Sequence, residues 1–221
     1  MTVYGTVSEL KIRIQIDSVM TAAQDAMLLE ILTAASKSLD QFCNRERDGF
    51  QALTVATARH FVGKGEAWLR IPECVEVTSV AVKASVTATT YTAWSTPTTA
   101  MAGDGDWIPA AGSHLYPTYD RLPYTLLLVD VNSEYSYFLG SNATPVITVT
   151  AKWGPSVAIP TDIREACLMQ SAKMYKRFQA SAGRSTGSID FAKISYQRGL
   201  DQLVKQVLID GGWVVPLYGN P

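Results

Sequence analysis

Two neighbouring stretches decide the fold of this chain: Val146-Ile-Thr-Val-Thr-Ala-Lys-Trp153 and Pro160-Thr-Asp-Ile-Arg-Glu-Ala166. The first alternates apolar and polar residues, which predicts a half-buried strand. The second opens with a proline and an acidic residue, and both suit the first turn of a helix. The chain therefore changes from strand to helix between these two stretches.

Helical patterns continue to the end of the chain and also begin it. Downstream, apolar residues recur at helical spacing to about Asp210, with a Gly-rich break at 181–188 and a stop at Gly211-Gly212. At the other end, residues 6–44 predict two helices, each opened by a capping box. The boxes pair Thr6 with Glu9 and Thr21 with Gln24. The second helix has one apolar face, made of Leu28, Ile31, Leu32, Ala35, Leu39 and Phe42.

The middle of the chain has the two-residue period of strands. Pro72 is expected to stop one of these strands. Residues 95–122 are rich in Thr, Pro, Gly and Asp and predict a long loop or arm. The expected strands cover 53–61, 68–71, 75–83, 89–94, 124–131 and 146–153.

These patterns predict an α+β fold in which a helical bundle built from both chain ends carries an inserted small β barrel or sandwich. We expect the helices at 22–44 and 161–180 to pack together and to bury Leu32, Leu39, Met174 and Phe178. The expected parts are 1–50 and 159–212 for the two halves of the helical core, 51–158 for the β domain with its loop at 95–122, and 213–221 for an extended C-terminal tail.

Composition bounds the function. The 221 residues are 47% hydrophobic and 18% charged, with a net charge of −1. A near-neutral chain argues against a dedicated DNA-binding protein. The low charge suggests surface that partners bury, although extended loops would give the same statistic. Cys43, Cys74 and Cys167 are far apart and odd in number, so we expect neither disulfides nor a zinc site, as suits a reducing cytoplasm.

No catalytic or targeting signature was found in the sequence. The nucleophile elbow, the zincin motif, the P-loop and the dinucleotide fingerprint are all missing. His60 is expected to be an ordinary strand histidine, and Asp104-Gly-Asp106 a polar turn rather than the start of a calcium loop. No apolar run reaches 18 residues, and residues 1–10 lack the order of a signal peptide. The sequence therefore predicts a non-enzyme with no cofactor, no metal and no membrane contact.

Several stretches, taken in order, carry a resemblance to a known family. They are Tyr4 to Ile14, Leu28 to Asp40, Asn44-Arg-Glu-Arg47, Gly65-x-x-x-Leu69-x-Ile71-Pro72, Val77-Thr-Ser-Val80, Trp153-Gly-Pro155 and Pro160 to Ala166. With this order and spacing the chain resembles the head–tail connector (adaptor) proteins of tailed bacteriophages. The β-rich residues 53–153 depart from the shortest, nearly all-helical members, so what they contact is left open.

The resemblance implies a structural virion protein, made in the bacterial host cytoplasm and located in the neck of the particle. It implies a homo-oligomeric ring, most often of twelve copies, that docks under the portal protein and receives the tail, its stopper or its tail-tube protein. DNA would pass through the ring only as cargo. The family has no catalytic residues and no cofactor.

Two groups of residues are candidate contact sites. Lys173, Lys176, Arg177 and Arg184 form the most basic local cluster and are candidates to face the DNA channel. The alternative is a solvated helix face that pairs with acidic groups of a neighbour. The apolar tail is expected to contact the portal or a neighbouring subunit, and the alternative is that it folds back onto its own helices. Its candidate contact residues are Trp213, Val214, Val215, Pro216, Leu217 and Tyr218.

A rival interpretation comes from another class of protein. The chain would then be a ligand- or carbohydrate-binding β module of a tail or baseplate component, with the aromatic residues from Tyr116 to Phe138 as its binding surface. Native mass discriminates the two, since an adaptor forms large rings and a binding module is monomeric or trimeric.

Overall fold

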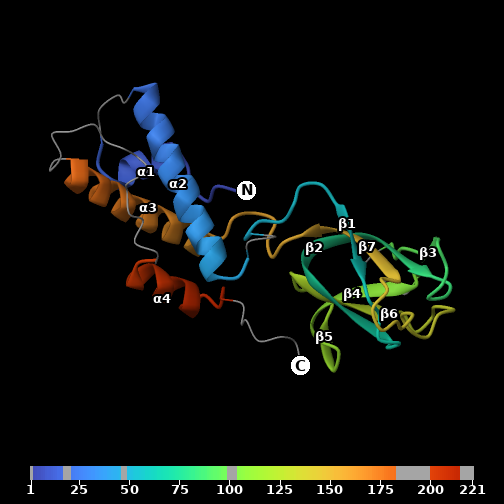
Figure 1. Ribbon diagram of the computed structural model, residues 1–221. Helices are drawn as coiled ribbons and strands as arrows, with labels where there is room; N and C mark the ends of the chain where they lie inside the picture. The colour runs from blue at the N-terminus through green and yellow to red at the C-terminus, as the bar shows by residue number, and fades with distance from the viewer. Residues whose placement is uncertain (1, 17–20, 46–48, 99–103, 183–199, 215–221) are drawn as a thin grey trace. The chain divides into compact units, whose positions relative to one another are not determined.

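The computed structural model describes the whole chain except residues 1, 17–20, 46–48, 99–103, 183–199 and 215–221. The chain divides into two units, Met1–Phe50 with Ile159–Pro221 and Gln51–Ala158. The first unit contains the helices and the second contains the strands (Figure 1). The predicted α+β class is confirmed.

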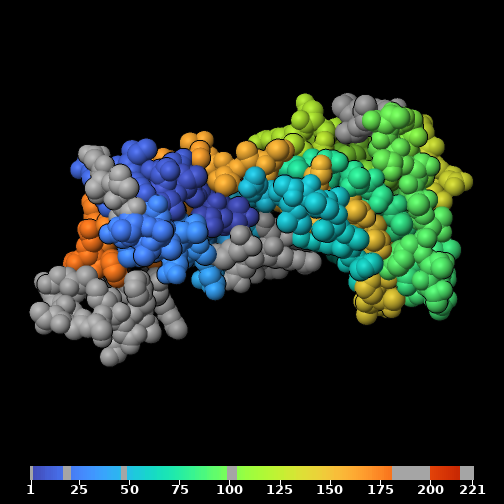
Figure 2. Space-filling model, turned by 90° about the horizontal axis from the view of Figure 1, so that it is seen from above, coloured from blue at the N-terminus to red at the C-terminus, as the bar shows by residue number. Residues whose placement is uncertain are grey.

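The helical unit contains four helices in its described part: α1 (Val7–Arg13), α2 (Ala22–Phe42), α3 (Thr161–Ala182) and α4 (Gln202–Asp210). Both predicted capping boxes form, because Thr6 and Thr21 each accept a hydrogen bond from the third residue of their helix. Gly211 caps α4, as the sequence indicated. Figure 2 shows the α1 segment, in dark blue, lying beside α2 at the surface of this unit.

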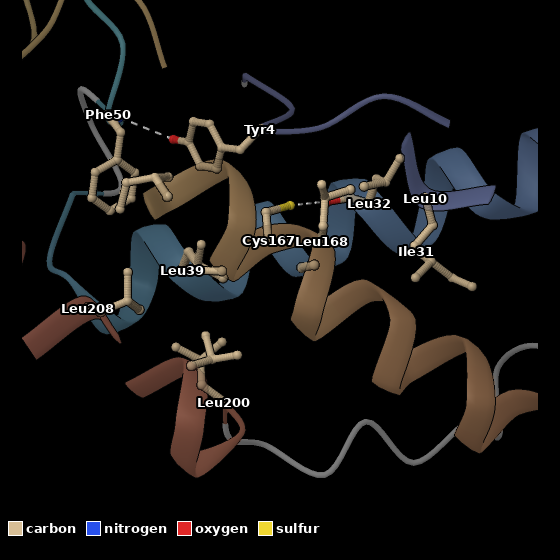
Figure 3. Close-up of a cluster of buried hydrophobic side chains, with 14 of the residues drawn as sticks. Tyr4, Leu10, Ile31, Leu32, Leu39, Phe50, Cys167, Leu168, Leu200 and Leu208 are labelled. Carbon is tan, nitrogen blue, oxygen red and sulfur yellow. Dashed lines mark hydrogen bonds between the residues drawn. The ribbon is translucent and has the colours of Figure 1, made fainter. Parts of the chain in front are cut away.

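One hydrophobic core holds the helical unit together, and both ends of the sequence contribute to it (Figure 3). Leu32 and Leu39 of α2 are fully buried, as expected. Met174 and Phe178 are only half-buried, so their predicted burial was wrong. The fully buried positions on α3 are those of Ile163, Ala166, Cys167 and Ser171, and Met174 packs at the edge of the core.

The second unit is an antiparallel sheet around a separate core. Its strands are β1 (Thr57–Phe61), β2 (Trp68–Lys83), β3 (Tyr91–Ala93), β4 (Trp107–Ser113), β5 (Tyr116–Thr118), β6 (Tyr124–Val129) and β7 (Ile147–Trp153). They pair in the order β1-β7-β2-β6-β4-β5, and β3 pairs with β2. No pairing joins β1 to β5 among the described strands, so closure into a barrel or sandwich stays a prediction.

Two predictions about the strands were wrong. Pro72 does not stop a strand, because it lies in β2 where the pairing with β6 shifts register between Arg70 and Cys74. A proline is tolerated there because an interrupted ladder does not need its missing N–H. The expected loop at 95–122 contains β4 and β5, which pair with each other, and β4 also pairs with β6.

The chain enters and leaves the β unit at one place. The Ala52 N–H donates to the Ser156 carbonyl at 2.7 Å, and the Leu53 N–H donates to the Trp153 carbonyl at 2.9 Å. Gly154 has φ +136°, and a Cβ at this position would lie 2.5 Å from the Ala52 Cα. A glycine is therefore needed where the two ends of the unit meet.

Candidate interaction surfaces

The basic cluster of α3 is only partly available for binding. Lys173 forms an ion pair with Asp201, the N-cap of α4. Lys176 and Arg177 are exposed, and no acidic group of the described residues lies within ion-pair distance of either. Arg184 lies outside the described residues. The structure therefore brings three of the four predicted residues onto one helix, and only two of them have no described ion-pair partner.

A groove of about 370 Å³ lies beside this cluster. It is formed by the end of α1, one face of α3 and the start of α4. Its apolar lining comes from Met169, Ala172 and Val204, and its charged lining from Arg13, Lys173, Lys176 and Asp201. No sequence pattern indicated Arg13 or Asp201 as part of this surface, because they come from helices far apart in the chain. The groove combines an apolar floor with an excess of positive charge.

Ion pairs hold α1 in place at this groove. Arg13 pairs with Glu165, and Arg164 pairs with Glu9 at 2.8 Å, so two charge pairs join α1 to α3. The Thr6 backbone N–H and hydroxyl, and then Arg164, lower the pKa of the Glu9 carboxyl below its usual value. Surface pairs of this kind contribute little stability individually. Their effect is to fix the position of Arg13 at the rim.

The start of the C-terminal tail folds back onto its own helices. The Trp213 indole N–H donates to Asp162, its ring packs edge-on against Phe50 at 5.6 Å, and its carbonyl accepts from the Arg45 Nε at 3.3 Å. Val214 also packs against the helical core. Trp213 and Val214 therefore follow the second of the two alternatives, in which the tail folds back onto its own helices. Val215, Pro216, Leu217 and Tyr218 lie outside the described residues.

A buried polar network lies next to Trp213. The Tyr4 hydroxyl donates to Asp40 at 2.5 Å and accepts from the Phe50 N–H at 3.3 Å. Burial, together with the hydrogen bond to Asp40, raises the pKa of the Tyr4 phenol far above its usual value. The guanidinium of Arg45 lies 5.4 Å from the centre of the Phe50 ring. These contacts tie the chain before α1, the exit of α2 and the segment after α4 together.

The aromatic residues of the β unit do not form one exposed surface. Trp94 stacks on Tyr135 at 4.6 Å and on Phe138 at 5.0 Å, and Phe138 is fully buried. Tyr116, which is 82% exposed, lies at the β4–β5 hairpin. Tyr135 and Phe138 therefore pack with Trp94 in the core of the β unit rather than forming a free binding surface.

The remaining candidate polar groups have structural roles. His60 lies in β1, as predicted, and its Nδ1 lies 2.9 Å from the Thr148 hydroxyl. Asp104 accepts hydrogen bonds from Thr98, and these bonds lower the pKa of its carboxyl. Asp106 accepts from the Ser95 N–H at 2.6 Å. Among the residues that the structure describes, no three His, Cys, Asp or Glu side chains gather where they could hold a metal.

The three cysteines are free and buried. Cys43 and Cys167 lie in the helical core, and burial raises the pKa of the Cys43 thiol to about 11. No helix in the described ranges is long and apolar enough to cross a membrane.

Comparison with known proteins gives matches among solved structures alone. No family model and no curated protein matches the chain. One solved match is a chain in the neck of an empty gene transfer agent particle, computed with C6 symmetry. It is 15% identical, covers 97% of this chain and 91% of that chain, and has a TM-score of 0.47. Another is a chain in the virion of a native gene transfer agent particle, 16% identical over the same shares, with a TM-score of 0.46. At this level the similarity carries no argument about function.

Proposed function

We propose that this chain is a structural, non-enzymatic protein of the neck of a phage-like particle. In this proposal it is a head-to-tail adaptor that forms a ring between the portal vertex and the tail or its stopper. The observation that carries the proposal is the helical core made from both chain ends, with the β unit inserted between α2 and α3. Members of the phage connector family, which this chain resembles, likewise have a helical core made from both chain ends.

The physical properties of the chain support such a role. A ring subunit presents two different faces to its two neighbours. Such head-to-tail contacts form a closed ring when the rotations between successive subunits add up to a full turn. A chain with 18% charged residues and a net charge of −1 has much weakly charged surface to bury in such contacts. The helical unit would form the bundle of the ring, and residues 51–158 an inserted domain that closes as a small barrel or sandwich.

DNA passes through the ring as cargo in this proposal. A passage needs weak binding, since strong electrostatic binding to phosphates would slow DNA movement. Arg177 is the best candidate in the basic cluster to face DNA, because it is exposed and lies outside the groove. Arg177→Glu should change DNA retention in particles that assemble normally. Unchanged retention would remove Arg177 from the DNA path.

Assembly with the portal tests the main proposal. The purified chain is mixed with the portal protein of its own particle, and the products are analysed by sedimentation velocity and negative-stain microscopy. We expect ring-sized complexes, with twelve copies as the number implied by the resemblance. A monomeric free chain is compatible with the proposal, because ring closure can require the portal as a template. A one-to-one complex with a single copy of this chain would contradict the proposal.

The end of the chain is the proposed portal contact, with a neighbouring subunit as the alternative. Because Trp213 belongs to the helical core, the informative deletion removes residues 215–221 and keeps Trp213 and Val214. The shortened chain should keep its helical circular dichroism and lose portal docking. Normal docking by this variant would show that Val215, Pro216, Leu217 and Tyr218 do not make the contact.

A further inference from the structure

Among the residues that the structure describes, one charge of the groove beside α3 has no opposite charge as its partner. Two of its basic residues are paired, Arg13 with Glu165 and Lys173 with Asp201. Lys176 has no acidic partner among the described residues. The floor of the groove is apolar and partly open to solvent, since Met169 and Ala172 are only partly buried. The groove therefore suits an apolar side chain flanked by one carboxylate.

The outer face of α2 has this combination. Leu29 is 48% exposed, and its neighbour in sequence, Glu30, is exposed about 100° further around the helix. No basic group of the described residues lies within ion-pair distance of Glu30. Ala26, one turn before Glu30, is exposed and small, so a partner can approach the helix closely here. An exposed leucine next to an unpaired acid matches the groove in both polarity and charge.

Glu30 and Lys176 point away from each other. Successive residues on a helix are rotated by about 100°. Glu30 therefore lies on the opposite side of α2 from the buried Leu28 and Leu32. On α3, Ala172 and Lys176 likewise lie opposite the buried Cys167. Since α2 and α3 pack through their buried sides, the groove and the outer face of α2 cannot meet within one copy.

We propose that the groove of one copy receives the outer face of α2 of a second copy, with Lys176 against the partner subunit's Glu30 and the partner subunit's Leu29 on the apolar floor. This contact is heterologous, so each copy uses one surface on each side and the contact repeats around a ring. The inference rests on the proposed ring function and names the faces that form the ring. The competing role for Lys176 is nucleic acid binding, and the test distinguishes it from the subunit contact.

The first experiment reverses each charge and then restores complementarity by mixing. Lys176→Glu and Glu30→Lys are each assayed by sedimentation velocity, alone and with the portal. Each variant alone should self-associate at least tenfold more weakly than the wild type, because like charges then face each other across the contact. An equimolar mixture should recover assembly, since alternating copies again place opposite charges together.

Matched controls separate this contact from a general charge effect. Arg177→Glu reverses the next residue of α3, which does not line the groove, and Glu66→Lys reverses an exposed acid of the β unit. Both should assemble like the wild type. All four variants should keep the wild-type melting temperature within a few degrees, since they change exposed side chains.

A cross-link tests the geometry without relying on charge. The chain carries only buried native cysteines, so an introduced surface cysteine has little competition. A mixture of Glu30→Cys and Lys176→Cys proteins should form a disulfide-linked pair under mild oxidation, and neither protein alone should do so. Absence of the linked pair in assembled rings would overturn the contact.

The outcomes distinguish this inference from the function on which it rests. If the wild type forms no oligomer with or without the portal, the ring function and the contact both fail. If the wild type forms rings and the reversals leave them unchanged, the contact is wrong and the ring function stands. If Lys176→Glu assembles normally and loses DNA retention, Lys176 faces DNA and the contact is overturned. Weakened single variants with a restored mixture support it.

Discussion

At the scale of single residues, Tyr4 joins three parts of the helical unit. It is fully buried, its N–H donates to the Ser36 hydroxyl at 3.1 Å, and its own hydroxyl lies between Asp40 and the Phe50 N–H. A buried phenol beside a carboxyl is held in its neutral form by both burial and the hydrogen bond. Tyr4 therefore links the residues before α1 to the middle and the exit of α2.

Tyr4→Phe should lower the free energy of unfolding of the helical unit by about 1.5–3 kcal/mol at pH 7, the usual range for a hydrogen bond to a charged group. In the unfolded chain the phenol ionises near pH 10, whereas the folded protein keeps it protonated to higher pH. Unfolding then releases a proton, so the wild type loses stability as the pH rises above 10. The gap between wild type and variant should shrink there, as measured by urea unfolding at 222 nm. A gap that is constant to pH 11 would contradict this account.

Gly154 is the second residue with a specific role. Gly154→Ala should destabilise the β unit by about 2–3 kcal/mol, because φ +136° is strained for an L-residue and the new Cβ would overlap the backbone of Ala52. Gly65→Ala is the matched control: its φ is +77°, but its Cβ would meet nothing within 4 Å, so it should cost only about 1 kcal/mol. Urea unfolding followed by tryptophan fluorescence measures both. Equal losses would show that the close approach to Ala52 has no effect.

At the scale of elements, the sequence correctly predicted those helices and strands whose signals lie in neighbouring residues. Capping boxes and apolar faces are local signals, and they placed α1 and α2 correctly, as alternation did for β7. Prediction from the sequence failed where an element depends on a partner that is distant along the chain. In β4, Pro109 and consecutive buried alanines hide the two-residue period, and pairing with β6 determines the strand. The same limit applies to the groove, whose lining comes from three helices.

The segment after α4 shows a similar long-range effect. Trp213 contacts Phe50, Arg45 and Asp162, all far away in sequence. Trp213→Ala should therefore lower the free energy of unfolding of the helical unit by about 2 kcal/mol, less than for a fully buried tryptophan because this one is half-buried. Thermal unfolding at 222 nm measures the loss. Trp213→Phe should recover part of the loss, since it keeps the ring contact and removes the N–H donor. An unchanged melting temperature for Trp213→Ala would mean that the ring adds nothing to the fold.

At the scale of the whole molecule, each unit has its own core. Residues 51–158 expressed alone should fold, because the hydrogen bonds of Ala52 and Leu53 close the unit at its own ends. The fragment should unfold cooperatively in urea and keep the dispersed amide resonances of a folded sheet. A fragment without a cooperative transition would show that the strands need the helices to fold.

The closed ends of the β unit also favour an order of folding in which the sheet forms before the helices meet. For α2 to meet α3, the chain must close a loop of roughly a hundred residues, which costs about 4 kcal/mol in chain entropy. Once the β unit has folded, the hydrogen bond between Ala52 and Ser156 shortens this loop to roughly fifteen residues, and about 2 kcal/mol of that cost disappears from the second step. The folded sheet therefore brings together helices that are distant in sequence. A sheet that folds more slowly should delay the packing of α2 against α3, because the long loop then stays open for longer.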